Sequence, residues 1–170
     1  MEPLASLDDA RRKVLRDTQV LLANVLSLAS PPIKSAAQGV RLLKRIRQEA
    51  YEDINQIQHE HLIVAAAEWL ITIGHASRDT EWFWNPRQTG SVSEPDLEGR
   101  HGTAIAVSAE ITTSANPAGT IATRMQWTLT KLSRMPGLKF YFVSTEAMRM
   151  RAKSKVVKIG AEIEVVLLDA

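Results

Sequence analysis

The first 75 residues carry apolar side chains at helical spacing. Ser6, followed three residues later by Asp9, resembles a capping box, so a first helix is expected to begin there. Ser30-Pro31-Pro32 ends it, because a residue that precedes proline is pushed out of helical geometry. The apolar stripe of this helix consists of Val14, Leu15, Leu21, Leu22, Val25, Leu26 and Leu28.

A second helical pattern runs from about Ser35 to about Ile73. A helix of that length is unusual in a small domain, so a bend or a break is expected within it. One face of the pattern carries Ile46, Ala50, Ile54, Ile57, Val64 and Ala65.

Beyond Gly74 the chain becomes rich in aromatic and β-branched residues interrupted by glycine, proline and asparagine, which indicates strands and turns. The expected strands are 81–86, 103–113, 139–145 and 161–168, with a turn-rich connection before Asp96 and a turn at Glu98-Gly99-Arg100. Residues 103–113 alternate most clearly, with Ile105, Val107, Ala109 and Ile111 on one face and Ala106, Ser108, Glu110 and Thr112 on the other.

Two helices are expected between these strands. Asn116 is a natural cap and Pro117 occupies the favoured first position of a helix whose apolar stripe ends before Pro136. The second helix covers 145–158. A strand–helix–strand order implies parallel strands with a helix packed on the sheet. The sequence therefore predicts an α/β fold, with a helical region (1–75) packing on a core (76–170) in one compact domain.

Composition narrows the class of protein. The chain has 170 residues and a formal charge of +2, from 21 basic and 19 acidic side chains. There is no cysteine, which excludes disulfides, thiol catalysis and iron–sulfur centres. No apolar stretch is long enough to span a bilayer, and the N-terminus does not resemble a signal peptide. We therefore expect a cytoplasmic protein without a membrane partner.

Asp96 and Glu110 are the candidate metal-binding and catalytic residues. Glu110 lies near the end of the alternating strand beside small side chains, and Asp96 precedes that strand. Each has an ordinary interpretation, since acids beside proline start turns and an edge strand tolerates a glutamate. Two carboxylates brought together repel, however, and a hard divalent cation relieves that repulsion.

These residues resemble the PD-(D/E)XK nuclease superfamily. Pro95-Asp96, the strand that ends in Glu110-Ile111-Thr112, the crossover helix and the strand KFYFVST carry the resemblance. It implies a restriction-endonuclease-like mixed sheet flanked by helices, and a magnesium (or manganese) ion held by Asp96, Glu110 and the carbonyl of Ile111. It also implies cleavage of DNA, with an upstream glutamate as accessory acid. Glu60 is the first choice for that acid, and Glu49, Glu52 and Glu68 are its rivals.

The chain departs from the pattern at Thr112, which occupies the place of the family's lysine. A threonine hydroxyl can orient a water molecule but supplies no positive charge, and losing such a contact costs about 100- to 1000-fold in rate. Lys131 and Arg124 lie seven residues apart on the expected crossover helix, so they project from nearly the same face. Either is a candidate for the displaced positive group.

Residues 148–158 concentrate basic side chains without an acid. They are candidates for phosphate contacts, and the solvated face of a surface helix is the competing interpretation. The candidate nucleic-acid ligands are Arg124, Arg149, Arg151, Lys153 and Lys155.

Two other functions remain open. One is a catalytically inactive module of the same fold, disarmed at Thr112, that binds nucleic acid or a partner protein. The other is an assembly protein whose N-terminal helices pair in a homodimer. The metal hypothesis requires that Asp96 and Glu110 share a pocket and that neither is locked away by an internal ion pair.

Overall fold

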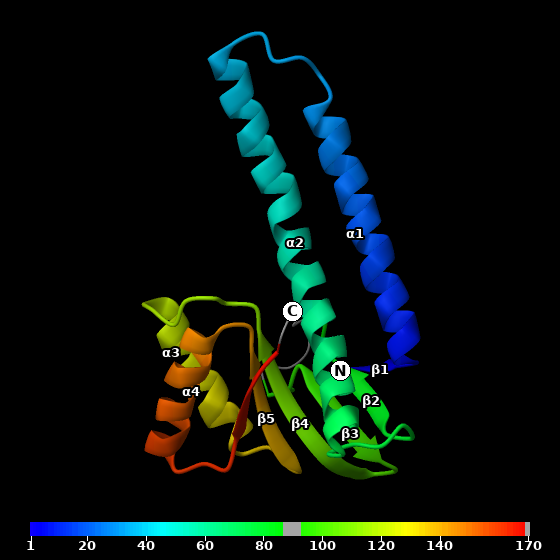
Figure 1. Cartoon of the computed structure of the whole chain (residues 1–170), viewed down its shortest axis with the longest axis vertical. Coiled ribbons are helices and arrows are strands. Elements are labelled where there is room, and N and C mark those ends of the chain that lie inside the picture. The colour runs from blue at the N-terminus through cyan, green and yellow to red at the C-terminus, as the bar shows by residue number, and fades with distance from the viewer. Residues whose placement is uncertain (87–92, 169–170) are drawn as a thin grey trace.

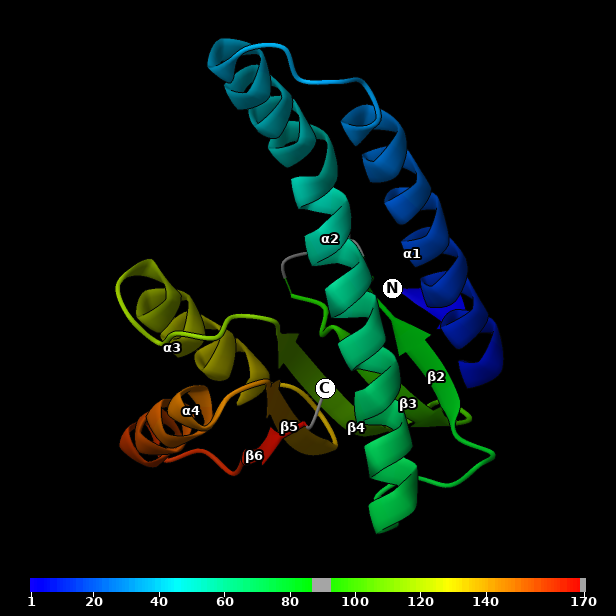
Figure 2. The same ribbon diagram turned by 45° about the horizontal axis from the view of Figure 1, so that its top comes forward.

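The computed structural model describes residues 1–86 and 93–168. Within these residues the chain forms a six-stranded mixed sheet with helices on both faces, in strand order β1-β2-β3-β4-β5-β6. A two-helix hairpin extends well past the sheet, as two views at 45° to each other show (Figures 1 and 2). The α/β class and the flanking helices agree with the sequence-based expectation.

The hairpin consists of α1 (Leu7–Ala29) and α2 (Ala36–Ile73). The Ser6 hydroxyl accepts a hydrogen bond from Asp9 N at 3.0 Å, so α1 begins at its predicted cap. The Ser35 hydroxyl accepts one from Gln38 N at 3.2 Å, so α2 begins near its predicted start. The second helix was expected to bend or break, and it does not break, because α2 is one continuous helix of 38 residues. Packing supports both parts of it, because α1 lies along both halves and the second half also lies against the sheet.

The first four strands form an antiparallel series: β1 (Glu2–Leu4), β2 (Glu81–Trp84), β3 (Leu97–His101) and β4 (Ala104–Thr112). Neither β1 nor β3 was predicted, and the expected turn at 98–100 is part of β3. The prediction of a turn rested on Gly99, because glycine is common in turns. A Cβ there would lie 2.9 Å from the Trp82 ring, so the glycine makes room for a neighbouring tryptophan within the sheet.

Two parallel strands follow, β5 (Leu138–Val143) and β6 (Glu164–Leu167). They are reached through the crossover helices α3 (Thr120–Leu132) and α4 (Glu146–Ile159). The predicted start of α3 was wrong, because its cap is Gly119 rather than Asn116. The Thr145 hydroxyl donates to the Ala115 carbonyl at 2.8 Å and ties this non-helical stretch to the start of α4.

The sheet separates two apolar cores. Val107, Ala109 and Ile111 of β4 face the core under α2, whereas Tyr141 and Val143 of β5 face the core under α3 and α4. The alternation predicted for β4 is therefore confirmed. Its consequence is that Glu110 points away from the α2 core, toward the side that α3 covers.

Gly137 fixes the approach of β5 to β4. Its φ is +73°, and a Cβ would lie 2.6 Å from both the carbonyl carbon and the carbonyl oxygen of Ala106. The Ser108 hydroxyl donates to the adjacent Pro136 carbonyl at 2.9 Å. The loop after α3 thus lies directly on the β4 backbone, which sets the position of α3 over the Glu110 side.

Candidate functional site

Asp96 and Glu110 lie close together at one end of the β3–β4 pair. Glu110 belongs to β4, and Asp96 directly precedes β3, whose register pairs Leu97 with Ala109. The Asp96 backbone N–H donates to the Ala109 carbonyl at 3.1 Å, which holds Asp96 beside the end of β4. Both side chains are buried, with exposed fractions of 4% and 5%. The β3–β4 turn thus brings together two residues that are fourteen positions apart in the sequence.

The two carboxylates line one cavity of about 440 Å³. It lies where β4 and β5 reach their C-terminal ends, between the middle of α2 and the start of α3. Ligands bind at this edge of parallel strands in many α/β proteins. The other lining residues used below are Tyr51, Gln56, His59, Pro86, Ile111, Thr112, Arg124, Thr128 and Tyr141.

Asp96 is held by the backbone of β4 and by a histidine. Its Oδ2 accepts a hydrogen bond from Ile111 N at 2.8 Å and lies 3.4 Å from His59 Nε2. The other ring nitrogen of His59, Nδ1, lies 3.2 Å from the Pro86 carbonyl oxygen. Burial lowers the pKa of His59, but the contact with Asp96 outweighs it and leaves the pKa above its usual value. Both ring nitrogens face acceptors, which favours the imidazolium form.

Glu110 has a lysine partner from α3. Lys131 forms an ion pair with Glu110 Oε1 and also donates to the Glu94 carbonyl at 3.0 Å. Burial and the nearby charge of Asp96 raise the pKa of Glu110 to about 8, and Lys131 offsets only part of that rise. The raised pKa means that the Asp96–Glu110 pair repels when both carboxylates are ionised, and that a proton on Glu110 relieves this repulsion.

Thr112 and Tyr141 lie next to Glu110. The Thr112 hydroxyl accepts a hydrogen bond from Ser114 N at 3.2 Å, and Thr112 lines the cavity. Tyr141 is the partner of Glu110 in the β4–β5 register. Burial, reinforced by the Glu110 charge, raises the pKa of the Tyr141 hydroxyl above its usual value, so this hydroxyl stays protonated.

The donor set fits a magnesium ion bound by two carboxylates. The protein contacts engage Asp96 Oδ2 and Glu110 Oε1. Within the part of the chain that the structure describes, Asp96 Oδ1 and Glu110 Oε2 have no protein partner. That part also contains no group of three or more His, Cys, Asp or Glu side chains suited to a metal. Magnesium typically uses one or two carboxylates, with waters and substrate phosphate oxygens completing its shell.

The ion pair between Lys131 and Glu110 bears on this fit in two ways. It is the contact that we named from the sequence as adverse to a metal site. It is also the contact expected of a lysine that replaces the one missing at Thr112. Lys131 contacts Oε1 of Glu110, which leaves the other carboxylate oxygen, Oε2, for a metal ion.

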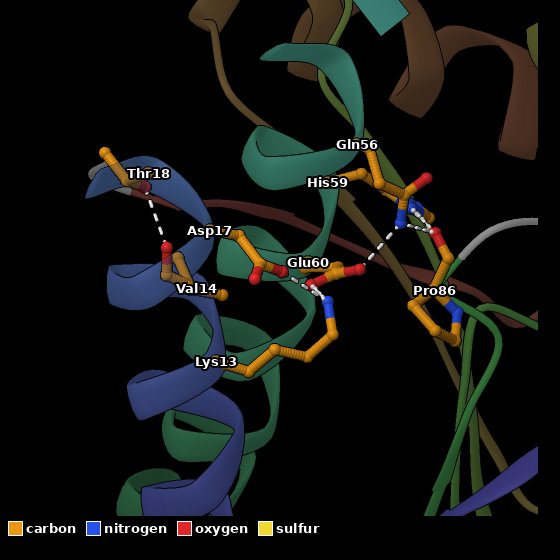
Figure 3. Close-up of polar contacts among 8 residues, drawn as sticks. All are labelled: Lys13, Val14, Asp17, Thr18, Gln56, His59, Glu60 and Pro86. Atoms are coloured by element: carbon orange, nitrogen blue, oxygen red, sulfur yellow. Dashed lines mark hydrogen bonds and ion pairs between the residues drawn. The ribbon is translucent and has the colours of Figure 1, made fainter. Parts of the chain in front are cut away.

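Glu60 is not brought into the cavity. Its side chain is fully buried and pairs with Lys13 of α1 at 2.5 Å, and it accepts a hydrogen bond from Gln56 at 2.9 Å. Figure 3 shows it turned toward α1, with Gln56 between it and Pro86. Its neighbour His59 points the other way and reaches Asp96.

The candidate nucleic-acid ligands divide into two groups. Arg124 lines the cavity and lies seven residues before Lys131 on α3. The other four lie on α4, and none of them lines this cavity. Arg149 pairs with Glu146 at 2.8 Å, Lys155 donates to Gln126 at 3.1 Å, and Arg151 and Lys153 are exposed.

Sequence reasoning missed His59 and Gln56. Two histidines two residues apart, such as His59 and His61, point in different directions on a helix and cannot share a zinc ion, so their spacing gives no metal signal. A usable signal was present, because the buried face Ile63, Ala67 and Leu70 extends back at helical spacing to His59 and then Gln56. Polar residues that continue an apolar helix face indicate where the core gives way to a site.

Comparison with known proteins gives no match for this chain among family models, curated proteins or solved structures. A search of the helices in the described residues found none with the length and apolar character needed to cross a membrane.

Proposed function

We propose that this protein is a metal-dependent nuclease of the PD-(D/E)XK type that hydrolyses phosphodiester bonds in DNA. The observation that carries the proposal is that the buried Asp96 and Glu110 line one cavity, with Lys131 beside Glu110. Sequence spacing alone gave the two acids as candidates. Their burial against each other supports a site rather than two surface residues.

Asp96 Oδ1 and Glu110 Oε2 would hold the magnesium or manganese ion, with the Ile111 carbonyl as the third ligand that the resemblance implies. Such an ion polarises a phosphate and activates a water molecule for attack. The Ile111 N–H and His59 keep Asp96 in place, so this carboxylate needs little reorganisation to bind a cation.

Lys131 supplies the positive charge that Thr112 lacks. Because its ammonium group also donates to the Glu94 backbone carbonyl, Lys131 is held next to Glu110, which lines the cavity. Placed there, it stabilises negative charge that develops on a phosphate. Arg124, on the same side of α3, would contact a phosphate at the mouth of the cavity.

A cleavage assay with matched acid variants tests the proposal. Purified protein is incubated with linear, nicked and single-stranded DNA in magnesium or manganese, and Asp96→Asn, Glu110→Gln and Lys131→Met are compared with wild type. Each is expected to lose about 100-fold or more in rate. Glu98→Gln is the control, because Glu98 is a buried acid two residues further along β3 that pairs with Arg100 outside the cavity.

Calorimetric titration with manganese gives a readout that does not depend on cleavage. Wild type and Glu98→Gln are expected to bind one ion, and Asp96→Asn and Glu110→Gln to bind it far more weakly. Cleavage that survives unchanged in both acid variants would falsify the assigned roles.

A second function is favoured by one observation. Each acid already faces a cation of the protein, His59 at Asp96 and Lys131 at Glu110. A cavity neutralised in this way suits a non-catalytic module that binds nucleic acid. DNA binding by wild type without manganese binding and without cleavage would establish this alternative.

A further inference from the structure

One side of α2 carries a row of polar residues that runs from the outer part of the hairpin to the cavity. The residues follow each other at steps of three or four, which places them on one face of the helix. The outer ones are exposed, Asn55 is half-buried and His59 is buried, so the row descends into the site. We call it the polar stripe of α2, and its members are Arg41, Lys44, Gln48, Tyr51, Asn55 and His59.

The polar stripe lies on the side of α2 that is turned away from α1. Ala50 and Asp53 border the space between the two helices, and they lie roughly half a turn around the helix from the stripe. Figures 1 and 2 both place α1 on one side of α2 and the beginning of α3 on the other. The stripe therefore faces the side on which α3 contributes Arg124 to the cavity.

A groove extends the cavity along this stripe. Its lining residues are Lys44, Arg47, Gln48, Tyr51 and Glu52. The last two also line the cavity of the site, so the groove and the cavity meet there. The fourteen steps of helix from Arg41 to Asn55 rise about 21 Å at 1.5 Å per residue. The surface next to the site therefore extends well beyond the two carboxylates.

The cations of this surface are available to a ligand. Within residues 1–86 and 93–168, no ion pair or side-chain hydrogen bond engages Arg41, Lys44 or Arg47. Glu52 is the acid in the lining of the groove, and the two cations there outweigh it. The groove thus favours an anionic ligand, although the charge of the whole chain is nearly balanced.

Tyr51 adds an aromatic surface between these cations and the cavity. Its side chain is 56% exposed. Grooves that bind single-stranded nucleic acid combine positive charge for the phosphates with aromatic rings on which bases stack. The bases of a duplex already stack on each other, so such a ring is used by unpaired bases. The order of cations, aromatic ring and cavity matches a single strand that reaches the site along α2.

We propose that the polar stripe of α2, with Arg47 at its edge, binds single-stranded DNA and leads it into the cavity. Arg41, Lys44 and Arg47 contact phosphates of the strand, and one base stacks on Tyr51. The strand then passes between α2 and Arg124 of α3 to reach the two carboxylates. This assignment rests on the proposed function, which makes DNA the ligand of the cavity, and it specifies the form of that DNA.

Fluorescence anisotropy of the full chain tests the phosphate contacts. The probe is a labelled single strand of about 20 nucleotides, longer than the site sizes of such grooves, in EDTA so that no metal-dependent cleavage occurs. Arg41→Gln, Lys44→Gln and Arg47→Gln combined should lower the affinity about 10-fold or more. They should also flatten the slope of log affinity against log salt by about 2, since each phosphate contact on a single strand contributes about 0.7.

A second triple variant removes the same charge elsewhere on the hairpin. Arg12→Gln, Arg16→Gln and Arg45→Gln combined should bind the strand as wild type does. Arg12 and Arg16 lie on α1, and Arg45 is held by Glu49 of its own helix at 2.6 Å. None of these three arginines lines the cavity or the groove.

Two further positions test the stacking and the charge separately. Tyr51→Ala should lower the affinity for the single strand about 5-fold or more and change duplex binding little, whereas Tyr51→Phe should retain it, because the ring is kept. Glu52→Gln should tighten binding, since it removes the acid of the groove. A gain of affinity in this variant is not a result that a damaged fold produces.

The proposal is overturned if wild type does not bind the single strand, or binds a duplex of the same length more tightly. It is also overturned if the Arg41, Lys44 and Arg47 variant binds as its control does. Binding through these cations without any cleavage upholds the assignment and rejects the nuclease. Cleavage that requires Asp96 and Glu110, with unchanged binding by the α2 variants, rejects the assignment alone.

Discussion

Asp96 accepts a hydrogen bond from the backbone N–H of Ile111 at 2.8 Å, so the side chain before β3 is fixed to the far end of β4. Asp96→Ala removes this acceptor and leaves a buried N–H unpaired, which costs about 1–3 kcal/mol of unfolding free energy. Asp96→Asn retains an acceptor oxygen and should cost less. Urea denaturation of the three proteins makes the comparison.

The same variants separate the structural role of Asp96 from its electrostatic role. In Asp96→Ala the pKa of His59 should fall, because burial then acts without the opposing carboxylate. An NMR titration of His59 measures this. Equal stability of the Ala and Asn variants would contradict the role assigned to the Ile111 hydrogen bond.

The stability of the protein should decline as pH rises through neutrality. Burial raises the pKa of Glu110 from 4.5 to about 8, so between these values the folded state binds a proton more tightly than the unfolded chain. The resulting stabilisation is complete below the unfolded pKa and is lost as pH approaches the folded one. The raised pKa of His59 acts in the same direction above 6.5.

Glu110→Gln isolates the glutamate's share of this effect. The fall in unfolding free energy between about pH 5 and about pH 8 should be shallower in the variant, since an amide does not titrate. Urea denaturation without added metal at several pH values supplies the slope, with Glu98→Gln as the matched control. An identical slope in wild type and Glu110→Gln would mean that this carboxyl does not titrate across the range.

Lys13 and Glu60 join the two helices of the hairpin near its base, where the Glu60 carboxylate is fully buried. Lys13→Met would leave that charge without its cation, at a cost of about 3–5 kcal/mol. Lys13→Met combined with Glu60→Leu should recover most of the loss, because no buried charge remains. Thermal or urea unfolding of the single and double variants measures the coupling, and simple additivity would show that the ion pair contributes nothing specific.

The parts of the site that local pattern could predict were those set by strand alternation. Ile111 faces the α2 core, so its neighbour Glu110 had to face the other way. The stripe that buries Met125, Leu129 and Leu132 of α3 was equally legible from spacing. These features depend on a few adjacent residues.

The remaining parts depend on contacts between distant segments. His59 and Glu60 are adjacent on α2, and only His59 lines the cavity. Glu60 instead pairs with Lys13, which lies 47 residues earlier in the chain. The strand β3 was missed because Gly99 looks like a turn until Trp82 is placed beside it. Lys131 and Arg124 were both candidates from the sequence, and that Lys131 is the one that pairs with Glu110 depends on the position of α3 over β4.

The continuity of α2 connects its outer end to the cavity. Its first half carries the exposed Val40 and Leu43, and Gln56 and His59 further along form part of the cavity wall. Both stretches belong to one uninterrupted helix. A contact that displaces the outer arm would therefore be transmitted to the imidazole beside Asp96 through the helix itself, without passing through a loop.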